Sequence, residues 1–235
     1  GAFAGCNRAW LPLFDSRGEW NGSIAARTDV TGLNELMAQH ETVETLDELR
    51  DDIWILDKLI LSRKLGYNCG PIGLDVPYSG YYIVRPCVNM LGLGLGAKKM
   101  WLEKDTCDLP YGYFWCEWFT GFHHSVDYYN GTQILCVQGN KPEDTFIKWS
   151  EWIRSDKRFK FPTFLNSLIE RHPWINCEFI GDKLIEVHFR RNEDFDGNTN
   201  HFIPVWEGQD TTPPPGYKYR EYPDVHGRIG AFVNK

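Results

Sequence analysis

The sequence has no Cys-x-x-Cys pair, although it contains seven cysteines in 235 residues. An odd number of scattered cysteines argues against both a disulfide framework and a structural zinc site. Reduced cysteines are typical of a reducing compartment, so we expect a cytoplasmic protein. The glycosylation patterns at Asn21 and Asn130 are then chance matches. Asn130-Gly131 instead predicts a tight hairpin turn.

Excess positive charge and long apolar runs are also missing. The formal net charge of −7 argues against nucleic acid as a partner, because binding to a phosphate backbone requires a basic surface. A single nucleotide needs only a few local cations. No apolar run approaches the roughly 20 residues that cross a bilayer, and the first ten residues lack the pattern of a signal peptide. We therefore expect no membrane partner.

Helical and strand patterns alternate irregularly along the chain, which favours an α+β fold. The patterns predict helices near Thr31 and after a capping box at Thr45 and Glu48. Further helices are predicted over 52–66, 143–155 and 162–172, and an irregular tail from residue 192. Predicted strands cover 9–14, 81–86, 113–119, 124–129, 132–138, 175–180 and 183–191.

A glycine-rich stretch follows the predicted strand 81–86. Gly92, Gly94 and Gly96 alternate ahead of Lys98 and Lys99. Such a loop can bring backbone N–H groups to phosphates while the lysines neutralise charge. It is neither a Walker nor a Rossmann motif, and a flexible surface hairpin is the alternative.

The predicted hairpin 175–191 carries acidic residues. A turn at Gly181-Asp182 places Glu178 opposite Glu186 or its neighbour, and Glu186, His188 and Arg190 share one strand face. Paired carboxylates repel each other unless a cation lies between them. Oxygen ligands beside phosphates are typical of a magnesium site, whereas a solvated face with charge pairs is the alternative. The other face is apolar and is expected to pack on the helix 162–172; it consists of Ile185, Val187 and Phe189.

Two adjacent histidines, His123 and His124, begin another predicted strand. Successive strand residues face opposite ways, so the two imidazoles are not expected to bind one metal ion. Surface or hydrogen-bonded histidines are the simpler interpretation.

In their order and spacing, these motifs resemble the ATP-grasp superfamily between about Asp57 and Arg190. DKLILSRKLG is similar to a family helix, YIVRP to a strand that usually ends in Lys-Pro, and LGLGLGAKK to the mobile glycine loop over ATP phosphates. FWCEWFTGFHHSVD is similar to the hinge beside the adenine, and INCEFIGDKLIEVHFR to the paired metal-binding strands.

The resemblance implies an α+β fold in which two lobes with antiparallel sheets enclose a nucleotide. Residues 1–52 would form a short segment before a core of residues 53–235, whose lobes would cover roughly 53–116 and 117–235. Most members of the superfamily are ligases that join a carboxylate to an amine through an acyl phosphate, with ATP and Mg²⁺. The sequence does not identify the carboxylate or the amine, and it leaves a homo-oligomer open.

The resemblance also implies residue roles. Arg190, Lys98 and Lys99 would be catalytic, and Glu178, Glu186 and His188 would bind the metal. The residues implied at the nucleotide are Lys58, Arg85, Gly92, Gly94, Gly96, Glu117, Trp118, Phe119 and His123.

Two positions depart from the pattern of the superfamily. His188 replaces an Asn, which argues against a second Mg²⁺ ion or shifts the expected metal preference towards Mn²⁺. Arg85 replaces a Lys, which keeps the charge but changes its geometry. A catalytically degenerate nucleotide-binding or structural module is therefore the alternative to an active ligase. Tail residues that could contribute to an acceptor site, or form a plain surface, are Arg220, Tyr222, His226 and Arg228.

Overall fold

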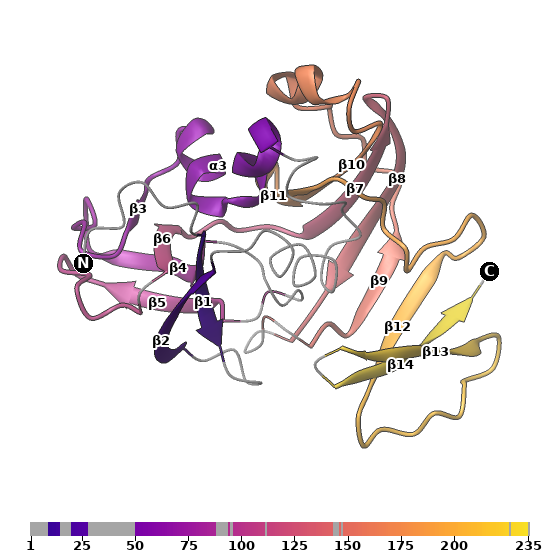
Figure 1. Ribbon diagram of the computed structural model, residues 1–235. Helices are drawn as coiled ribbons and strands as arrows, with labels where there is room; N and C mark the ends of the chain where they lie inside the picture. The colour runs from indigo at the N-terminus through magenta and orange to yellow at the C-terminus, as the bar shows by residue number, and fades with distance from the viewer. Residues whose placement is uncertain are drawn as a thin grey trace. The chain divides into compact units, whose positions relative to one another are not determined.

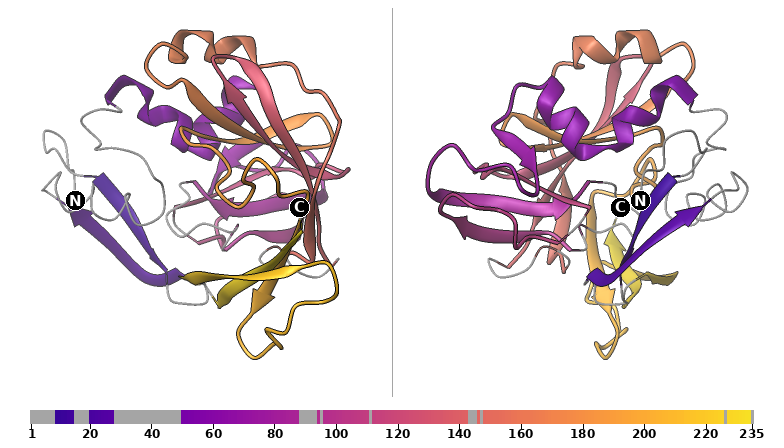
Figure 2. Two further views of the ribbon diagram at one scale, coloured as in Figure 1. Left: turned by 90° about the vertical axis from the view of Figure 1, so that its right-hand side faces the viewer. Right: turned by 60° about the vertical axis from the view of Figure 1, so that its left-hand side comes forward.

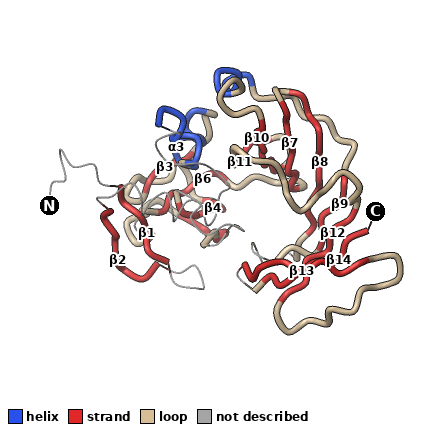
Figure 3. The backbone as a smooth tube through the Cα atoms, turned by 45° about the vertical axis from the view of Figure 1, so that its right-hand side comes forward, coloured by secondary structure: helices blue, strands red, loops and turns tan. Residues whose placement is uncertain are grey.

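The computed structural model describes residues 9–14, 20–27, 50–87, 94, 96–110, 112–142, 146, 148–225 and 227–234. The chain divides into two compact units, Gly1–Trp118 (unit 1) and Phe119–Lys235 (unit 2). Strands dominate the described residues of both units (Figure 3), and the helices among these residues are short. The fold is of the α+β class that the sequence predicts, although sheet predominates. The predicted helix near Thr31 and the capping box at Thr45 lie outside the described residues.

Unit 1 contains two sheets (Figure 1). Strands β1 (Ala9–Phe14) and β2 (Trp20–Arg27) pair antiparallel, which confirms the predicted first strand. The second sheet has four strands in the order β3-β6-β4-β5. Their bounds are β3 Cys69–Pro71, β4 Gly80–Pro86, β5 Lys98–Leu102 and β6 Tyr113–Glu117.

The four-stranded sheet packs its core by alternation. Tyr82 and Val84 of β4 are buried together with Leu102 and Trp115 in one apolar cluster. Intervening residues such as Arg85 lie on the other face. Two short helices lie beside this sheet (Figure 2), the 3-10 helix η1 (Arg50–Leu56) and α3 (Lys58–Lys64).

The single helix predicted over 52–66 is therefore interrupted at Asp57. Asp57 has an extended backbone, with φ −85° and ψ 105°, and its carboxylate accepts a hydrogen bond from Ile60 N. This N-cap starts a new helix, so η1 and α3 are separate elements. The predicted end is confirmed: Arg63 and Lys64 occupy the last turn, and Gly66 follows with a φ of 74°.

Unit 2 is built on one eight-stranded sheet with the order β11-β10-β7-β8-β9-β12-β14-β13. Neighbouring strands are antiparallel throughout. The strand bounds are β7 His123–Tyr129, β8 Thr132–Asn140, β9 Glu151–Arg154, β10 Trp174–Ile180, β11 Lys183–His188, β12 His201–Trp206, β13 Lys218–Val225 and β14 Arg228–Asn234. An apolar cluster on one sheet face joins β8, β12 and β14 through Val137, Phe202 and Val233.

The helix predicted over 143–155 is wrong at its described end, because residues 151–154 form β9. Asn140 of β8 pairs with Glu151, and Phe202 of β12 pairs with Trp152. Two neighbouring strands therefore supply hydrogen bonds that override the helical pattern of this stretch.

The irregular tail predicted from residue 192 is also wrong, because β12, β13 and β14 complete the sheet. Pro204 lies inside β12, where a proline normally argues against a strand. The pairing of β12 with β9 ends at Phe202, whereas Pro204 pairs with Ala231 of β14. The missing N–H of Pro204 therefore costs no ladder hydrogen bond towards β9.

The helix predicted over 162–172 is reduced to the 3-10 helix η2 (Thr163–Leu168), and Pro162 precedes it rather than occupying its first turn. Leu165 and Leu168 of η2 are buried. The His172 ring stacks on Phe189 at 3.8 Å between ring centres. No helix in the described ranges is long and apolar enough to cross a membrane.

The predicted turn at Asn130-Gly131 is confirmed between β7 and β8. Both residues have positive φ, 47° for Asn130 and 74° for Gly131. This geometry matches the right-handed twist of the flanking strands.

Replacing Gly131 with Ala should destabilise the protein by about 1–2 kcal/mol, because a residue with a Cβ would then have to adopt a left-handed backbone conformation. It would also meet Ile169 Cδ1 at 3.2 Å. Urea unfolding measures the effect. Gly197→Ala is the matched control, because nothing lies within 4 Å of its added Cβ. Equal stabilities of the two variants would contradict the expected strain.

Candidate functional site

Three neighbouring strands of unit 2 bring polar side chains to one face of the sheet. Glu178 of β10 lies opposite Ser125 of β7 and opposite Glu186 of β11, and Asn176 lies opposite His188. Because directly opposite residues share a face, these strands form one polar face. It consists of His123, Ser125, Asp127, Asn176, Glu178, Glu186 and His188.

The two carboxylates are compensated by two imidazoles. His123 Nε2 lies 3.0 Å from Glu178 Oε2. His188 Nε2 lies 3.4 Å from Glu186 Oε1 and 3.9 Å from Glu178 Oε1. The prediction that Glu178 lies opposite Glu186 or its neighbour is confirmed: a register shift between Glu178 and Phe179 places it opposite Glu186.

Glu178 is ionised at neutral pH in this arrangement. Burial raises its pKa, but the hydrogen bond and charge of His123, with the charge of His188, more than offset burial, and the net pKa is lowered. The observed partner of His123 is therefore Glu178. The resemblance had implied that His123 lies near the ribose of the nucleotide. The role at the ribose stays a prediction.

Ser125, Asp127 and Asn176 of the polar face form a buried hydrogen-bond network. Asn176 Nδ2 donates to Ser125 Oγ at 2.8 Å and to Asp127 Oδ1 at 2.7 Å. The Asn192 N–H donates to both oxygens of Asp127 at 3.0 Å. Burial raises the pKa of Asp127, and the positive charge of Arg190 opposes that rise. The network thus fixes the chain beyond β11, where Arg190 lies.

The sequence reasoning missed Asp127 and Asn176 as members of this face. Their signal was present as polar residues at alternate positions of two strands, Ser125 and Asp127 in one and Asn176 and Glu178 in the other. Only the register between the strands shows that the two alternations meet.

Aromatic rings border the polar face at His123. The His123 ring lies 4.8 Å from Trp149 and 5.5 Å from Trp152, centre to centre. Gly139 makes this packing feasible, because a Cβ there would lie 2.7 Å from a Trp149 carbon. Trp152 lies on the same sheet face as the carboxylates, because Gly139 pairs with both His123 and Trp152.

His124 belongs to the opposite face from His123, as the strand alternation predicted. Its Nδ1 lies 3.2 Å from Phe122 O, and its ring lies 5.1 Å from Phe159. Burial lowers its pKa, so the neutral form is favoured.

The polar face has donors suited to a divalent metal ion. Two carboxylates and an imidazole are ligands for Mg²⁺, Mn²⁺ and related ions. One oxygen each of Glu178 and Glu186 faces the same nitrogen of His188. Even so, the described ranges contain no group of three or more His, Cys, Asp or Glu side chains already arranged to hold a metal. The donor chemistry fits such an ion, while the side chains pair with one another.

In unit 1, strand β5 separates the two predicted lysines. Lys98 pairs with Val84 of β4, and Lys99 pairs with Ile83. Lys98 therefore lies on the face of the buried Val84, and Lys99 lies on the face that carries Arg85. Of the two lysines, Lys99 is therefore the one that shares a sheet face with Arg85.

Aromatic rings hold the Lys99 ammonium group. Its Nζ lies 4.6 Å from the centre of the Tyr81 ring and 4.6 Å from that of Trp118. Trp101 in turn contacts Tyr81 edge to face at 5.2 Å. Tyr81 and Trp101 are both more than half exposed. These cation–π contacts fix a positive charge at the surface of unit 1.

The other predicted nucleotide residues of unit 1 are distributed over several elements. The Lys58 side chain is buried at the start of α3. Glu117, at the end of β6, accepts a hydrogen bond from Asn68 N at 3.1 Å. The Arg85 guanidinium lies 5.4 Å from the Phe114 ring centre. Their roles at a nucleotide stay predictions.

Part of the predicted glycine loop is described. Gly94 and Gly96 have positive φ, 70° and 81°, whereas Gly92 lies outside the described residues. Trp118 ends unit 1 and Phe119 begins unit 2, so the predicted hinge residues fall at the boundary between the units.

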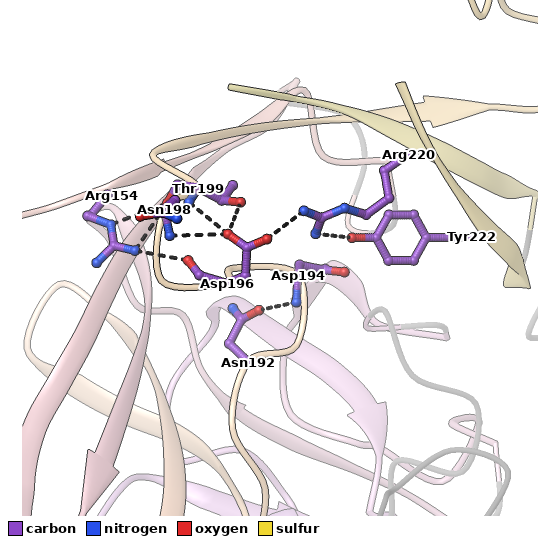
Figure 4. A network of polar contacts seen from close by, with 8 residues as sticks. All are labelled: Arg154, Asn192, Asp194, Asp196, Asn198, Thr199, Arg220 and Tyr222. Carbon is purple, nitrogen blue, oxygen red and sulfur yellow. Dashed lines mark hydrogen bonds and ion pairs between the residues drawn. The ribbon is translucent and has the colours of Figure 1, made fainter. Parts of the chain in front are cut away.

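Two of the tail residues considered for an acceptor site, Arg220 and Tyr222, belong to a hydrogen-bond network around Asp196 (Figure 4). Arg220 donates to Asp196 Oδ2 at 2.8 Å and to the Tyr222 hydroxyl at 3.2 Å. Arg228 donates to Asp194 Oδ2 at 2.8 Å. These ion pairs attach the loop after β11 to strands β13 and β14. His226 lies outside the described residues.

Asp196 should stabilise the fold in a pH-dependent way. Hydrogen bonds from Thr199, Asn198 and Arg220 lower its pKa from 3.8 to about 2. The stabilisation is complete above pH 3.8 and is lost as the pH falls through about 2. Asp196→Ala should therefore lower the Tm at neutral pH, and its difference from the wild type should shrink across that window. Asp156→Ala is the control for removal of an exposed carboxylate and should leave the Tm at neutral pH close to that of the wild type. A pH-independent deficit for Asp196→Ala in thermal scans would contradict the assignment.

No protein-family model and no curated protein sequence matches the chain. Several solved structures do. N5-carboxyaminoimidazole synthase from Aspergillus clavatus, in complex with ADP and 5-aminoimidazole ribonucleotide, is 10% identical, covers 89% of this chain and 74% of its own, and has a TM-score of 0.51. The ATP-grasp ligase PsnB, complexed with a minimal precursor, is 14% identical over 61% of this chain, with a TM-score of 0.38. L-amino acid ligase from Bacillus licheniformis is 13% identical, covers 77% of this chain and 66% of its own, and has a TM-score of 0.43.

The likeness to the Aspergillus enzyme shows that the chain has the ATP-grasp fold, as the sequence resemblance predicted. The chain spans only about half of PsnB, 54% of its length. At these identities the likeness describes the fold alone.

Proposed function

We propose that the chain binds ATP with a divalent metal ion and joins a carboxylate to an amine. The observation that carries the proposal is the meeting of Glu178, Glu186 and His188 on one sheet face of a chain with the ATP-grasp fold. In the proposed reaction a substrate carboxylate takes the γ-phosphoryl group and ADP leaves. The amine then attacks the acyl phosphate, and inorganic phosphate leaves.

Glu178, Glu186 and His188 are the residues we assign to the metal. When bound, the ion would neutralise phosphate oxygens. The mixture of oxygen and nitrogen donors suits Mn²⁺ as well as Mg²⁺. His123 would keep Glu178 ionised, and Arg190 would hold a phosphate or the acyl intermediate. This division of roles needs no protein nucleophile, because phosphoryl transfer depends on positioning and charge neutralisation.

In unit 1 we assign positive charge and backbone N–H groups to the nucleotide. Lys99 and Arg85 share a sheet face, which supports their assignment to phosphate. Lys98 lies on the opposite face, and its catalytic role is correspondingly less supported. The remaining residues assigned to the nucleotide are Lys58, Gly92, Gly94, Gly96, Glu117, Trp118, Phe119 and His123.

A second candidate function is a degenerate ATP-grasp module that binds a nucleotide or a partner without turnover. The pairing of both carboxylates with imidazoles favours it, because the carboxylates that would bind a metal already contact His123 and His188. ATP turnover with any carboxylate and amine excludes this alternative.

ATP with Mg²⁺ or Mn²⁺ should raise the Tm of the wild type, because a ligand at 100 times its Kd stabilises the native state by about 2.7 kcal/mol. Glu186→Gln should lose the metal-dependent part of the shift in a thermal-shift titration. Glu207→Gln is the matched control, since Glu207 is exposed in the turn after β12. The absence of any shift at millimolar ATP in a folded sample would refute nucleotide binding.

Lys99→Met should weaken ATP binding about tenfold, which corresponds to one charge-assisted hydrogen bond of roughly 1.5 kcal/mol. Lys98→Met should have a much smaller effect, because that side chain lies on the other sheet face. Isothermal titration calorimetry at fixed ionic strength compares the two variants. Equal losses would show that strand alternation does not decide which lysine contacts phosphate.

A further inference from the structure

Two cysteines of unit 1 face each other across neighbouring strands. Cys69 of β3 pairs directly with Cys116 of β6, so their side chains leave the same face of the sheet. Both are free thiols. The pair is therefore held in register by the sheet itself.

The flanking hydrogen bond identifies the type of this pair. Glu117 N donates to Asn68 O at 2.9 Å, one residue away from each cysteine. Cys69 and Cys116 thus occupy a non-hydrogen-bonded position of the antiparallel ladder, where Cα atoms are about 4.5 Å apart. Disulfides span Cα separations of about 4.4–6.8 Å. A bond between the two sulfur atoms is compatible with this register.

The two thiols differ in access and surroundings. Cys69 is partly exposed, whereas Cys116 is buried. Burial raises the pKa of Cys69, and the charges of Arg63 and Arg85 oppose that rise. Burial raises the pKa of Cys116 to about 12, and Ser62 donates a hydrogen bond that opposes it. An oxidant would thus meet Cys69 first, beside two guanidinium groups that favour an anionic reagent.

We propose that Cys69 and Cys116 form a disulfide modification site whose oxidant is a small anionic disulfide such as oxidised glutathione. The Cys69 thiolate attacks one sulfur of the reagent, forms a mixed disulfide and releases one small thiol. The Cys116 thiolate then attacks the Cys69 sulfur and releases the second small thiol. The two protein thiols lose two protons and two electrons, and the reagent disulfide is reduced to two thiols. The inference is independent of the proposed function.

Peptide mapping of the full chain tests the proposal. The folded protein is incubated with oxidised glutathione. It is then unfolded in the presence of an alkylating agent that blocks every remaining thiol, and cleaved before aspartate. Peptide 57–74 then carries Cys69 alone, and peptide 108–126 carries Cys116 alone. We expect these two peptides to be joined, lighter by two hydrogen atoms than their sum, and to separate on reduction.

Cys107→Ser is the matched control, because Cys107 is an exposed cysteine of the same unit. It should leave the yield of the joined peptides unchanged, whereas Cys69→Ser should abolish it. Mapping of the wild type needs no substitution of the buried Cys116, so the test does not depend on the folding of that variant. Alkylated Cys69 and Cys116 after incubation, or Cys69 bound only to glutathione or to another cysteine, would overturn the proposal.

Discussion

The register of β7, β10 and β11 is the constraint on which the candidate site depends. It places Glu178 opposite Glu186, and two carboxylates on one partly buried face repel each other unless positive charge lies between them. The imidazoles of His123 and His188 lie against these carboxylates, 3.0 Å from Glu178 and 3.4 Å from Glu186. A slip of one residue in the pairing of β10 with β11 would turn the side chains of one strand to the other face. The apolar side chains of that strand would then lie on the polar face. The electrostatics of the site therefore follow from the hydrogen-bond ladder.

The same sheet combines a polar and an apolar face for a physical reason. On the back of the polar face, Tyr128 contacts Phe161 at 5.0 Å between ring centres and Phe179 stacks on Phe159. This packing supplies the hydrophobic burial that stabilises the strands. Polar groups on the front can then be buried at modest cost, because Asn176 satisfies them with two hydrogen bonds.

Alternation has a parallel consequence in unit 1. Two adjacent lysines, Lys98 and Lys99, emerge on opposite faces of β5, and only Lys99 lies against aromatic rings. The same ladder geometry places Cys69 beside Cys116. In both units, side chains with reactive or charged groups are brought together by pairing between strands that are distant in sequence.

Local patterns in the sequence determined seven of the fourteen described strands, the Asn130-Gly131 turn and the placement of Glu178 opposite Glu186 or its neighbour, because these depend on period-two alternation and on turn residues close in the chain. The resemblance of ordered motifs correctly indicated the ATP-grasp fold. The sequence did not determine that residues 151–154 and the tail become strands, nor that Asp127 and Asn176 join the polar face. Those outcomes required partners far along the chain: β9 is a strand because β8 and β12 lie on either side of it, and Pro204 is tolerated because the pairing with β9 ends at Phe202. Only the tertiary structure decides them, because a hydrogen-bond ladder forms between two segments and cannot be predicted from the sequence of either segment alone.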